Sequence, residues 1–221
     1  MKIVKKLISK KKYSLKCPYD MKPTRVVVHN TANDAPARNE INYMCNNNNR
    51  VSFHWAVDDK EAVQGIPENR TAWHAGDGYG KGNKEGIAVE ICYSKSGGAR
   101  FEKAEDNAAE LIADILRRYN WGIEQVTKHQ DYSGKNCPHR TLELGWPRFL
   151  QKIKDRMDGD FAIGDKVKLK AGATYYNGKA IPSWLLKMPL YVRSINGNRV
   201  VVSILKIGAI TGAVNKKYLT K

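Results

Sequence analysis

The chain of 221 residues lacks any long hydrophobic run. None approaches the roughly 18 consecutive apolar residues that a transmembrane helix requires, so we expect no stable membrane insertion. The first 16 residues, MKIVKKLISKKKYSLK, are positively charged but have neither the apolar core nor the small-residue cleavage site of a signal peptide. We therefore expect no export through a standard signal.

Cysteine is also scarce. The four cysteines show no closely paired spacing, and a protein made in a reducing cytosol would keep them as thiols. Cys45 and Cys92 lie in segments with an apolar pattern and are predicted to be small packing residues rather than metal ligands.

Acidic residues are few relative to basic ones. The chain has 22 Asp and Glu and 38 Lys and Arg, which gives a net charge of +16. Such a surplus predicts a polyanionic partner, and nucleic acid, an anionic membrane or a phosphate-rich bacterial wall polymer would each satisfy it. Residues 158–221 carry a net +8, and the longer segment before them also carries +8. The C-terminal piece therefore has more than twice the charge per residue.

Apolar patterning predicts alternating strands and helices in residues 1–157. Residues 25–29 and 86–92 indicate buried strands, and residues 52–66 indicate a β-hairpin. Apolar residues at helical spacing predict a helix over residues 103–119. Two further helices are expected, one carrying Ile41, Met44 and Cys45 with Asp34 or Asn39 as its cap, and one carrying Leu142, Trp146, Phe149, Leu150 and Ile153.

This alternation is typical of an α/β domain whose helices pack on the faces of a central sheet. The pattern changes near Asp158-Gly159-Asp160, after which only short strands follow. Asn196-Gly197 lies between two of these strands and predicts a tight hairpin turn. We expect two domains, residues 1–157 and a small all-β barrel at residues 158–221.

Reactive side chains gather in residues 127–140, TKHQDYSGKNCPHR, which is too rich in Gly, Asn and Ser to be read as a helix. Zinc binds imidazole and thiolate readily, and the eight-residue gap from His129 to Cys137 suits a loop folded over an ion. His29 ends its predicted strand, where α/β sheets place their sites. Each of these residues also has an ordinary structural interpretation, and spacing alone does not establish a metal site.

Five motifs occur in one order along the first domain: HNTAN at 29–33, FHWAVDD at 53–59, TAWHAGDG at 71–78, GIAVEIC at 86–92 and HQDYSGKNCPHR at 129–140. Together they resemble the zinc-dependent N-acetylmuramoyl-L-alanine amidases of the type-2 amidase family. This family includes phage lysins and is related to the peptidoglycan recognition proteins. The resemblance covers roughly residues 20–155 and implies a central mixed β-sheet flanked by helices.

The resemblance implies a Zn²⁺ cofactor with His29, His129 and Cys137 as its ligands. It implies that Glu90 acts as general base and then general acid, and that Lys135 stabilises the oxyanion. Taken alone, Glu90 could be a carboxylate at an exposed strand end, and Lys135 a solvated loop lysine.

Other positions of the family pattern are less definite. Asn30, Trp73 and His74 are expected to bind substrate. Trp73 and His74 lie along the substrate groove in the family pattern, where His74 could either bind substrate or stabilise the transition state, and Asn30 and Thr31 are expected to shape the wall beside His29. Phe53 stands where many members have a tyrosine, so a tyrosine role is not expected. His54 and His139 are expected to be structural, the latter through a bond within its own loop.

The implied reaction is hydrolysis of the amide between N-acetylmuramic acid and L-alanine of the stem peptide. The C-terminal segment, with GATYYNGKAIPSW and TGAVNKKYL, resembles SH3-like wall-binding modules of lysins. We thus expect bacterial peptidoglycan and anionic wall polymers as partners, not nucleic acid, for a protein made in the host cytoplasm that acts at the wall after release. The oligomeric state is not predicted.

Three alternatives stay open at this point. The chain could bind peptidoglycan without cutting it, could use Cys137 as the nucleophile of a Cys–His hydrolase, or could bind nucleic acid. Zinc content and the products released from the wall distinguish these functions.

Overall fold

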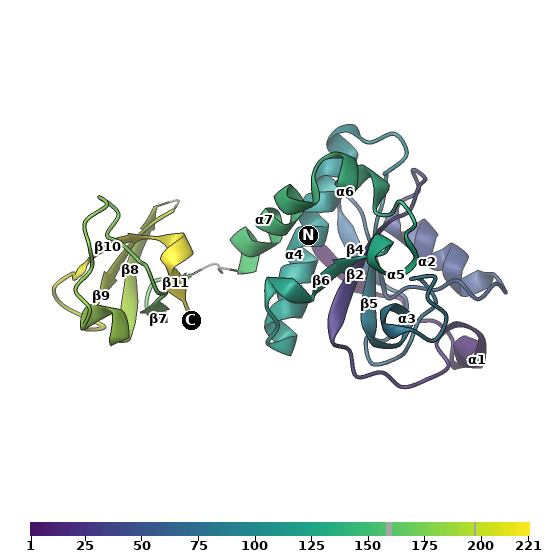
Figure 1. Cartoon of the computed structure of the whole chain (residues 1–221), viewed down its shortest axis with the longest axis horizontal. Helices are drawn as coiled ribbons and strands as arrows, with labels where there is room; N and C mark the ends of the chain where they lie inside the picture. The colour runs from purple at the N-terminus through teal and green to yellow at the C-terminus, as the bar shows by residue number, and fades with distance from the viewer. Residues whose placement is uncertain (158–160, 197) are drawn as a thin grey trace. The chain divides into compact units, whose positions relative to one another are not determined.

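The computed structural model describes residues 1–157, 161–196 and 198–221 (Figure 1). The chain forms two compact units, Met1–Lys154 and Asp155–Lys221. The predicted boundary at Asp158-Gly159-Asp160 lies outside the described residues. Each unit is described by itself below.

The first unit is built on a six-stranded mixed sheet with the order β1-β4-β3-β5-β2-β6. Neighbouring strands are parallel except for the antiparallel pair β3 and β4, which is the predicted hairpin. The predicted α/β class is thus confirmed. The strands are β1 Lys2–Lys5, β2 Arg25–Asn30, β3 Trp55–Val57, β4 Glu61–Gln64, β5 Gly86–Ile91 and β6 Val126–Lys128.

Helices cover both faces of this sheet. The long helix α4 (Gly98–Tyr119) lies on one side and α2 (Ala37–Asn46) on the other (Figure 1). Helix α4 contains the predicted helix and buries the apolar side that its sequence pattern indicated, including Ala104, Ala108, Leu111, Ile112 and Ile115. The short helices are α1 (Tyr13–Lys16), α3 (Lys81–Glu85) and α5 (Gln130–Ser133).

The last predicted helix is two helices in the structure, α6 (His139–Glu143) and α7 (Trp146–Met157). They are separated at Gly145, whose φ of 104° is open to glycine but strained for other residues. Phe149 and Ile153 of α7 are buried as predicted. A break between Glu143 and Trp146 therefore replaces the single continuous helix.

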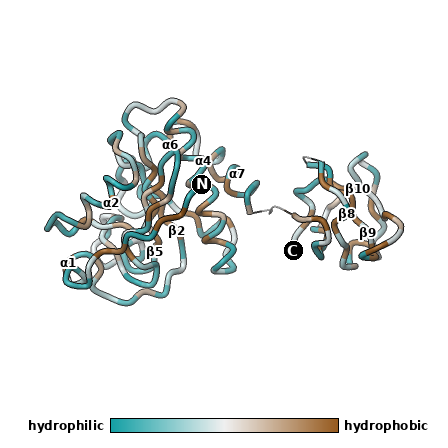
Figure 2. Tube along the Cα trace, turned by 180° about the vertical axis from the view of Figure 1, so that it is seen from behind, coloured by the Kyte–Doolittle hydropathy of each residue, from teal (hydrophilic) through white to brown (hydrophobic). Residues whose placement is uncertain are grey.

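Burial on both faces explains the apolar sequences of the central strands. The core residues of β2 and β5 are fully buried, and Figure 2 shows β2 running as a hydrophobic trace through the first unit. A strand covered on both sides has no need for polar alternation. The polar residues His29, Asn30 and Glu90 on these two strands are therefore exceptions that need a reason.

Two edge strands were not predicted. Strand β1 is rich in lysine and pairs only with β4, which is typical of edges protected against further pairing. Strand β6 has three residues, of which only Val126 is buried. Both strands are held by pairing with a neighbour rather than by their own apolar pattern.

The second unit is a five-stranded antiparallel sheet with the order β10-β9-β8-β7-β11. This confirms that the C-terminal segment is all-β. Strands β8 and β9 pair up to Asn196 and Arg199, as the hairpin prediction requires, although Gly197 lies outside the described residues. The strands are β7 Lys166–Leu169, β8 Leu190–Asn196, β9 Arg199–Ser203, β10 Gly212–Asn215 and β11 Leu219–Thr220.

The core of this unit is small and aliphatic, centred on Val167, Leu190, Val192, Val200 and Val214.

All four cysteines of the chain are free thiols, as expected, but Cys45 is only partly buried whereas Cys92 is fully buried. Within the described residues, no helix is both long and apolar enough to cross a membrane.

Helix α2 begins differently from the prediction. Its N-cap residue is Pro36, and neither Asp34 nor Asn39 caps it. Instead the buried carboxylate of Asp58, at the end of β3, accepts a hydrogen bond from the Ala37 amide at 3.0 Å. Its other oxygen accepts bonds from the amides of Lys60 and Glu61, both at 2.8 Å. One distant side chain therefore fixes both the helix start and the hairpin turn.

We predict that Asp58→Ala lowers the free energy of unfolding by about 2–3 kcal/mol, because three backbone donors, one buried and two partly buried, lose their acceptor. Urea unfolding followed by tryptophan fluorescence measures the change. Asp20→Ala is the control, because Asp20 is an exposed partner of Arg70 and its loss should have little effect. Equal unfolding midpoints for Asp58→Ala and the wild type would contradict the prediction.

Candidate metal centre

The site lies at the carboxyl ends of three neighbouring parallel strands, β5, β2 and β6. His29 on β2 is the register partner of Glu90 on β5. His129 follows directly after β6, and its amide continues the ladder by donating to the Val28 carbonyl at 3.2 Å. Because partners in a parallel sheet project to the same face, the strand register brings these side chains together.

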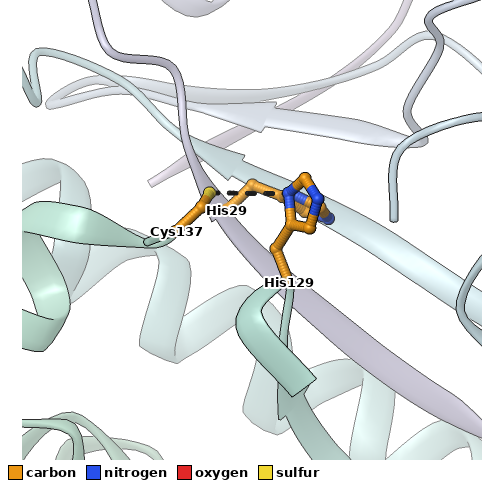
Figure 3. Close-up of side chains that lie close together, drawn as sticks. All are labelled: His29, His129 and Cys137. Atoms are coloured by element: carbon orange, nitrogen blue, oxygen red, sulfur yellow. Dashed lines mark hydrogen bonds between the residues drawn. The ribbon is translucent and has the colours of Figure 1, made fainter. Parts of the chain in front are cut away.

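Three side chains form a buried donor cluster (Figure 3). His29 Nδ1 lies 3.0 Å from His129 Nδ1 and 3.9 Å from Cys137 Sγ. The ligand atoms all lie within 4.8 Å of one another. The structure thus brings together the three residues predicted as zinc ligands, and this is the candidate metal cluster found among the described residues.

The geometry fits a zinc ion. Zinc–nitrogen bonds of about 2.0–2.1 Å and zinc–sulfur bonds of about 2.3 Å in a tetrahedron place two nitrogens about 3.3 Å apart, and nitrogen and sulfur about 3.6 Å apart. The two separations that involve His29 lie within a few tenths of an ångström of these values, and all three ligand atoms lie within 4.8 Å of one another. The donor set itself, two imidazoles and one thiol, is one that zinc prefers.

The loop that carries Cys137 folds back on the end of β6. The Gln130 amide donates to the Cys137 carbonyl at 2.9 Å, which closes the loop at its base. Helix α5 forms one turn within it and ends at Gly134, whose φ is 73°. The segment is thus more ordered than its Gly, Asn and Ser content predicted.

Glu90 is half-buried, but its Oε2 atom is buried and has no hydrogen-bond partner among the described residues. Burial, assisted by the charge of Glu40 and opposed by Lys135, raises the pKa of Glu90 to about 8. A buried carboxylate oxygen without a partner is costly unless something outside the protein chain engages it. Its strand position beside His29 places this carboxylate at the candidate metal site.

Lys135 is an exposed residue of the loop, two positions before Cys137. Burial is the main influence on the pKa values of the neighbouring groups, and the positive charge of Lys135 lowers each of them: Glu90, His29, His129 and Cys137. The ammonium group is therefore close enough to act electrostatically on the whole site.

A family model for N-acetylmuramoyl-L-alanine amidases matches residues 19–140. This match contains the five motifs, the three donors, Glu90 and Lys135.

The chain belongs to this amidase family.

Individual proteins agree with this assignment. The chain is 48% identical over 197 residues to N-acetylmuramoyl-L-alanine amidase CwlA of Bacillus subtilis, covering 85% of this chain and 72% of CwlA. It is 49% identical to the amidase XlyB of the same organism, covering 80% of this chain but only 56% of XlyB. The structure of PlyL matches 69% of this chain and 97% of its own at 60% identity, with a TM-score of 0.68.

Two further buried histidines, His74 and His54, lie near the candidate metal cluster. His74 is only 8% exposed, and its Nδ1 lies 3.0 Å from His29 Nε2. His54 is fully buried; its Nδ1 accepts from the Ala88 amide at 2.9 Å and its Nε2 bonds the Arg70 carbonyl at 2.8 Å. Burial lowers the pKa of His54 to about 4. The structural role expected for His54 is therefore confirmed.

Asn30 is engaged entirely within the protein. Its Oδ1 accepts from the amides of Arg140 and Thr141, at 2.9 and 3.2 Å, in the first turn of α6. Its Nδ2 donates to the His29 carbonyl at 3.1 Å. Asn30 thus caps α6 from the neighbouring strand. A substrate contact for Asn30 stays a prediction.

Trp73 is half-buried beside the site. Arg50 lies over its ring at 4.3 Å, and Tyr79 meets it edge to face at 5.4 Å. A substrate role for Trp73 stays a prediction.

Phe53, at the family's tyrosine position, is buried. His139 bonds the carbonyl of Ser94 at 3.2 Å, so its expected bond within its own loop is wrong.

We predict that Glu90 makes the metal-free amidase less stable as pH rises. The folded-state pKa of about 8 exceeds the ordinary value of 4.5, so the folded state retains a proton that the unfolded state has lost between these values. Glu90→Gln should therefore be more stable than the wild type above pH 8, and the difference should shrink towards pH 4. Urea unfolding with a chelator across this range measures it; a difference independent of pH would contradict the prediction.

Proposed function

We propose that the chain is a zinc-dependent peptidoglycan hydrolase that cleaves the amide between N-acetylmuramic acid and L-alanine of the stem peptide. The observation that carries this proposal is the buried cluster of His29, His129 and Cys137 beside the unpartnered carboxylate of Glu90. The names of the relatives support the amide bond as the bond that is cut.

His29, His129 and Cys137 would hold a zinc ion, which would supply Lewis-acid chemistry for an amide carbonyl and for water near neutral pH. Glu90 takes the proton as water attacks and delivers it to the leaving nitrogen of L-alanine. Without the ion, burial raises the pKa of Glu90 to about 8, and the positive charge of a bound zinc ion would favour the carboxylate that accepts the proton. The Lys135 ammonium stabilises the negative charge that develops on the carbonyl oxygen.

The raised pKa of the Cys137 thiol argues against a Cys–His hydrolase. Burial and the charge of Glu90 raise the pKa of Cys137 to about 11, against the lowered value that a nucleophilic cysteine needs. Metal binding instead provides the positive charge that stabilises a buried thiolate. A peptidoglycan-binding protein without activity would have no use for a complete ligand set with an adjacent acid–base residue.

For the second unit we propose an SH3-like domain that binds the bacterial cell wall. The match to CwlA covers 85% of the chain, more than the first unit contains, so it continues into the second. The excess of lysine and arginine suits anionic wall polymers. Four aromatic residues could contact wall sugars: Tyr175, Tyr176, Trp184 and Tyr191. Tyr176 and Trp184 are exposed, Tyr191 is half-buried, and Tyr175 packs against the core.

The resemblance to phage lysins leads us to propose an endolysin that lyses Gram-positive cell walls. It would be made in the host cytoplasm and would reach peptidoglycan after release. Neither nucleic acid nor stable membrane insertion forms part of this function.

The reaction is tested by digesting purified Gram-positive peptidoglycan and identifying the new chain ends. An amidase releases free amino groups of L-alanine without new reducing sugars. New reducing ends would mean cleavage of the glycan and would overturn the proposed reaction.

The proposed zinc ligands predict a specific loss. Cys137→Ala should fold but retain less than stoichiometric zinc after dialysis, because two imidazoles alone bind the ion weakly. Metal analysis of the purified protein measures this. Cys17→Ala is a matched control, since Cys17 is also a buried free thiol but lies outside the cluster. Full zinc content in Cys137→Ala would exclude this ligand.

The catalytic roles predict losses of turnover without loss of metal. Glu90→Gln should keep stoichiometric zinc and lower kcat by about 10²–10⁴-fold, the usual contribution of a general acid–base. Lys135→Met should lower kcat by about 10²–10³-fold with little change in KM. The rate at which free L-alanine amino groups appear, measured over a range of peptidoglycan concentrations, gives kcat and KM. Wild-type turnover in either variant would remove its assigned role.

A further inference from the structure

His74 occupies a place that the proposed reaction does not use. Its ring lies behind His29, on the side away from His129 and Cys137, with Nδ1 at 3.0 Å from His29 Nε2. The two rings are almost perpendicular, at 89°, and their centroids are 5.0 Å apart. With 8% of its surface exposed, His74 has little area to offer a substrate.

The two faces of His29 determine which of its nitrogens carries the proton. Nδ1 faces the other donors, so as a metal ligand it must present a lone pair to the ion. The proton of the neutral ring then lies on Nε2, which points at His74. For this contact to be a hydrogen bond, His74 Nδ1 must be the acceptor and its own proton must lie on Nε2.

The protein holds His74 in place for this contact. The side-chain oxygen of Asn83 accepts from the amides of His74 and Ala75, both at 2.8 Å. Asn83 itself is 3% exposed, and its Nδ2 donates to the Gly78 carbonyl at 2.9 Å. The ring of His54, fixed by backbone bonds at both nitrogens, packs against the ring of His74 at 6.1 Å.

We infer that His74 is a positioning residue of the metal centre: its Nδ1 accepts the Nε2 proton of His29 and thereby fixes the ring orientation and tautomer of that ligand. This inference rests on the proposed zinc site. Ligand histidines usually donate this second proton to a carboxylate, a carbonyl or water. A neutral imidazole is a weaker acceptor than a carboxylate, so it orients His29 while adding little negative charge to it. A bound ion would then be a stronger Lewis acid than one whose ligand histidine donates to a carboxylate.

Two variants of His74 separate positioning from packing. In His74→Asn the amide oxygen can take the place of Nδ1, whereas His74→Leu fills the space without an acceptor. We expect His74→Leu to bind zinc at least about 10-fold more weakly than the wild type, and His74→Asn to stay within a few-fold. Zinc affinity is measured by competition with a chromophoric chelator. His139→Asn is the control, because it replaces a histidine that bonds Ser94 instead.

A second readout needs no metal. Nitrogen NMR of the histidine rings in the metal-free full chain should show His29 protonated at Nε2 in the wild type, and a loss of this single tautomer in His74→Leu. The visible spectrum of the cobalt-substituted protein should also change in His74→Leu and be restored in His74→Asn.

The outcomes distinguish the two proposals. If the wild type binds no zinc, the proposed function fails, and the tautomer of His29 still decides whether His74 orients it. The inference about His74 is overturned if folded His74→Leu keeps wild-type zinc affinity and an unchanged cobalt spectrum. It is also overturned if His29 in the wild type carries its proton on Nδ1, a result that does not depend on whether any variant folds.

Discussion

The parallel pairing of β2 with β5 on one side and β6 on the other is the constraint on which the rest of the site depends. It aligns three strand ends, so Glu90, His29 and His129 meet although the last two are 100 residues apart in sequence. A shift of β5 or β6 by one residue would turn its functional side chain to the opposite face. Fully buried valines and isoleucines on these strands hold the register.

Polar side chains from neighbouring segments then fix the loops around this frame. Asn30 caps α6, Asn83 holds the backbone at His74, and Asp58 holds the start of α2. Each is a buried polar residue whose hydrogen-bonding atoms are matched by backbone groups, which makes its removal costly. These bonds connect segments that have no regular secondary structure of their own. They explain how a short loop can present Cys137 at a defined place.

Local sequence patterns were sufficient for the central features of the fold. The β-branched run of β2 and the apolar spacing of α4 predicted both elements, because each reflects burial along a single segment. The motifs likewise identified the three donors that the structure brings together. The patterns failed where a distant partner decides the outcome. Strand β6 has one buried residue and is held by β2, and α2 is capped from β3.

The hydrogen-bond partners of Asn30 and His74 were not predicted, for the same reason. Both lie within motifs close to the candidate metal ligands, and the family pattern indicated substrate contacts for them. Their partners are α6 and the second nitrogen of His29, and sequence spacing does not reveal either contact. Gly145 offered a usable signal, since a glycine before Trp-Pro is a common point at which one helix ends and another begins.

X-ray absorption at the zinc edge of the purified full chain tests the central claim most directly. The account predicts one sulfur neighbour at about 2.3 Å and nitrogen or oxygen neighbours at about 2.0–2.1 Å, with imidazole scattering from two rings. Bound zinc without a sulfur neighbour, or with a single imidazole, would contradict a centre built from His29, His129 and Cys137.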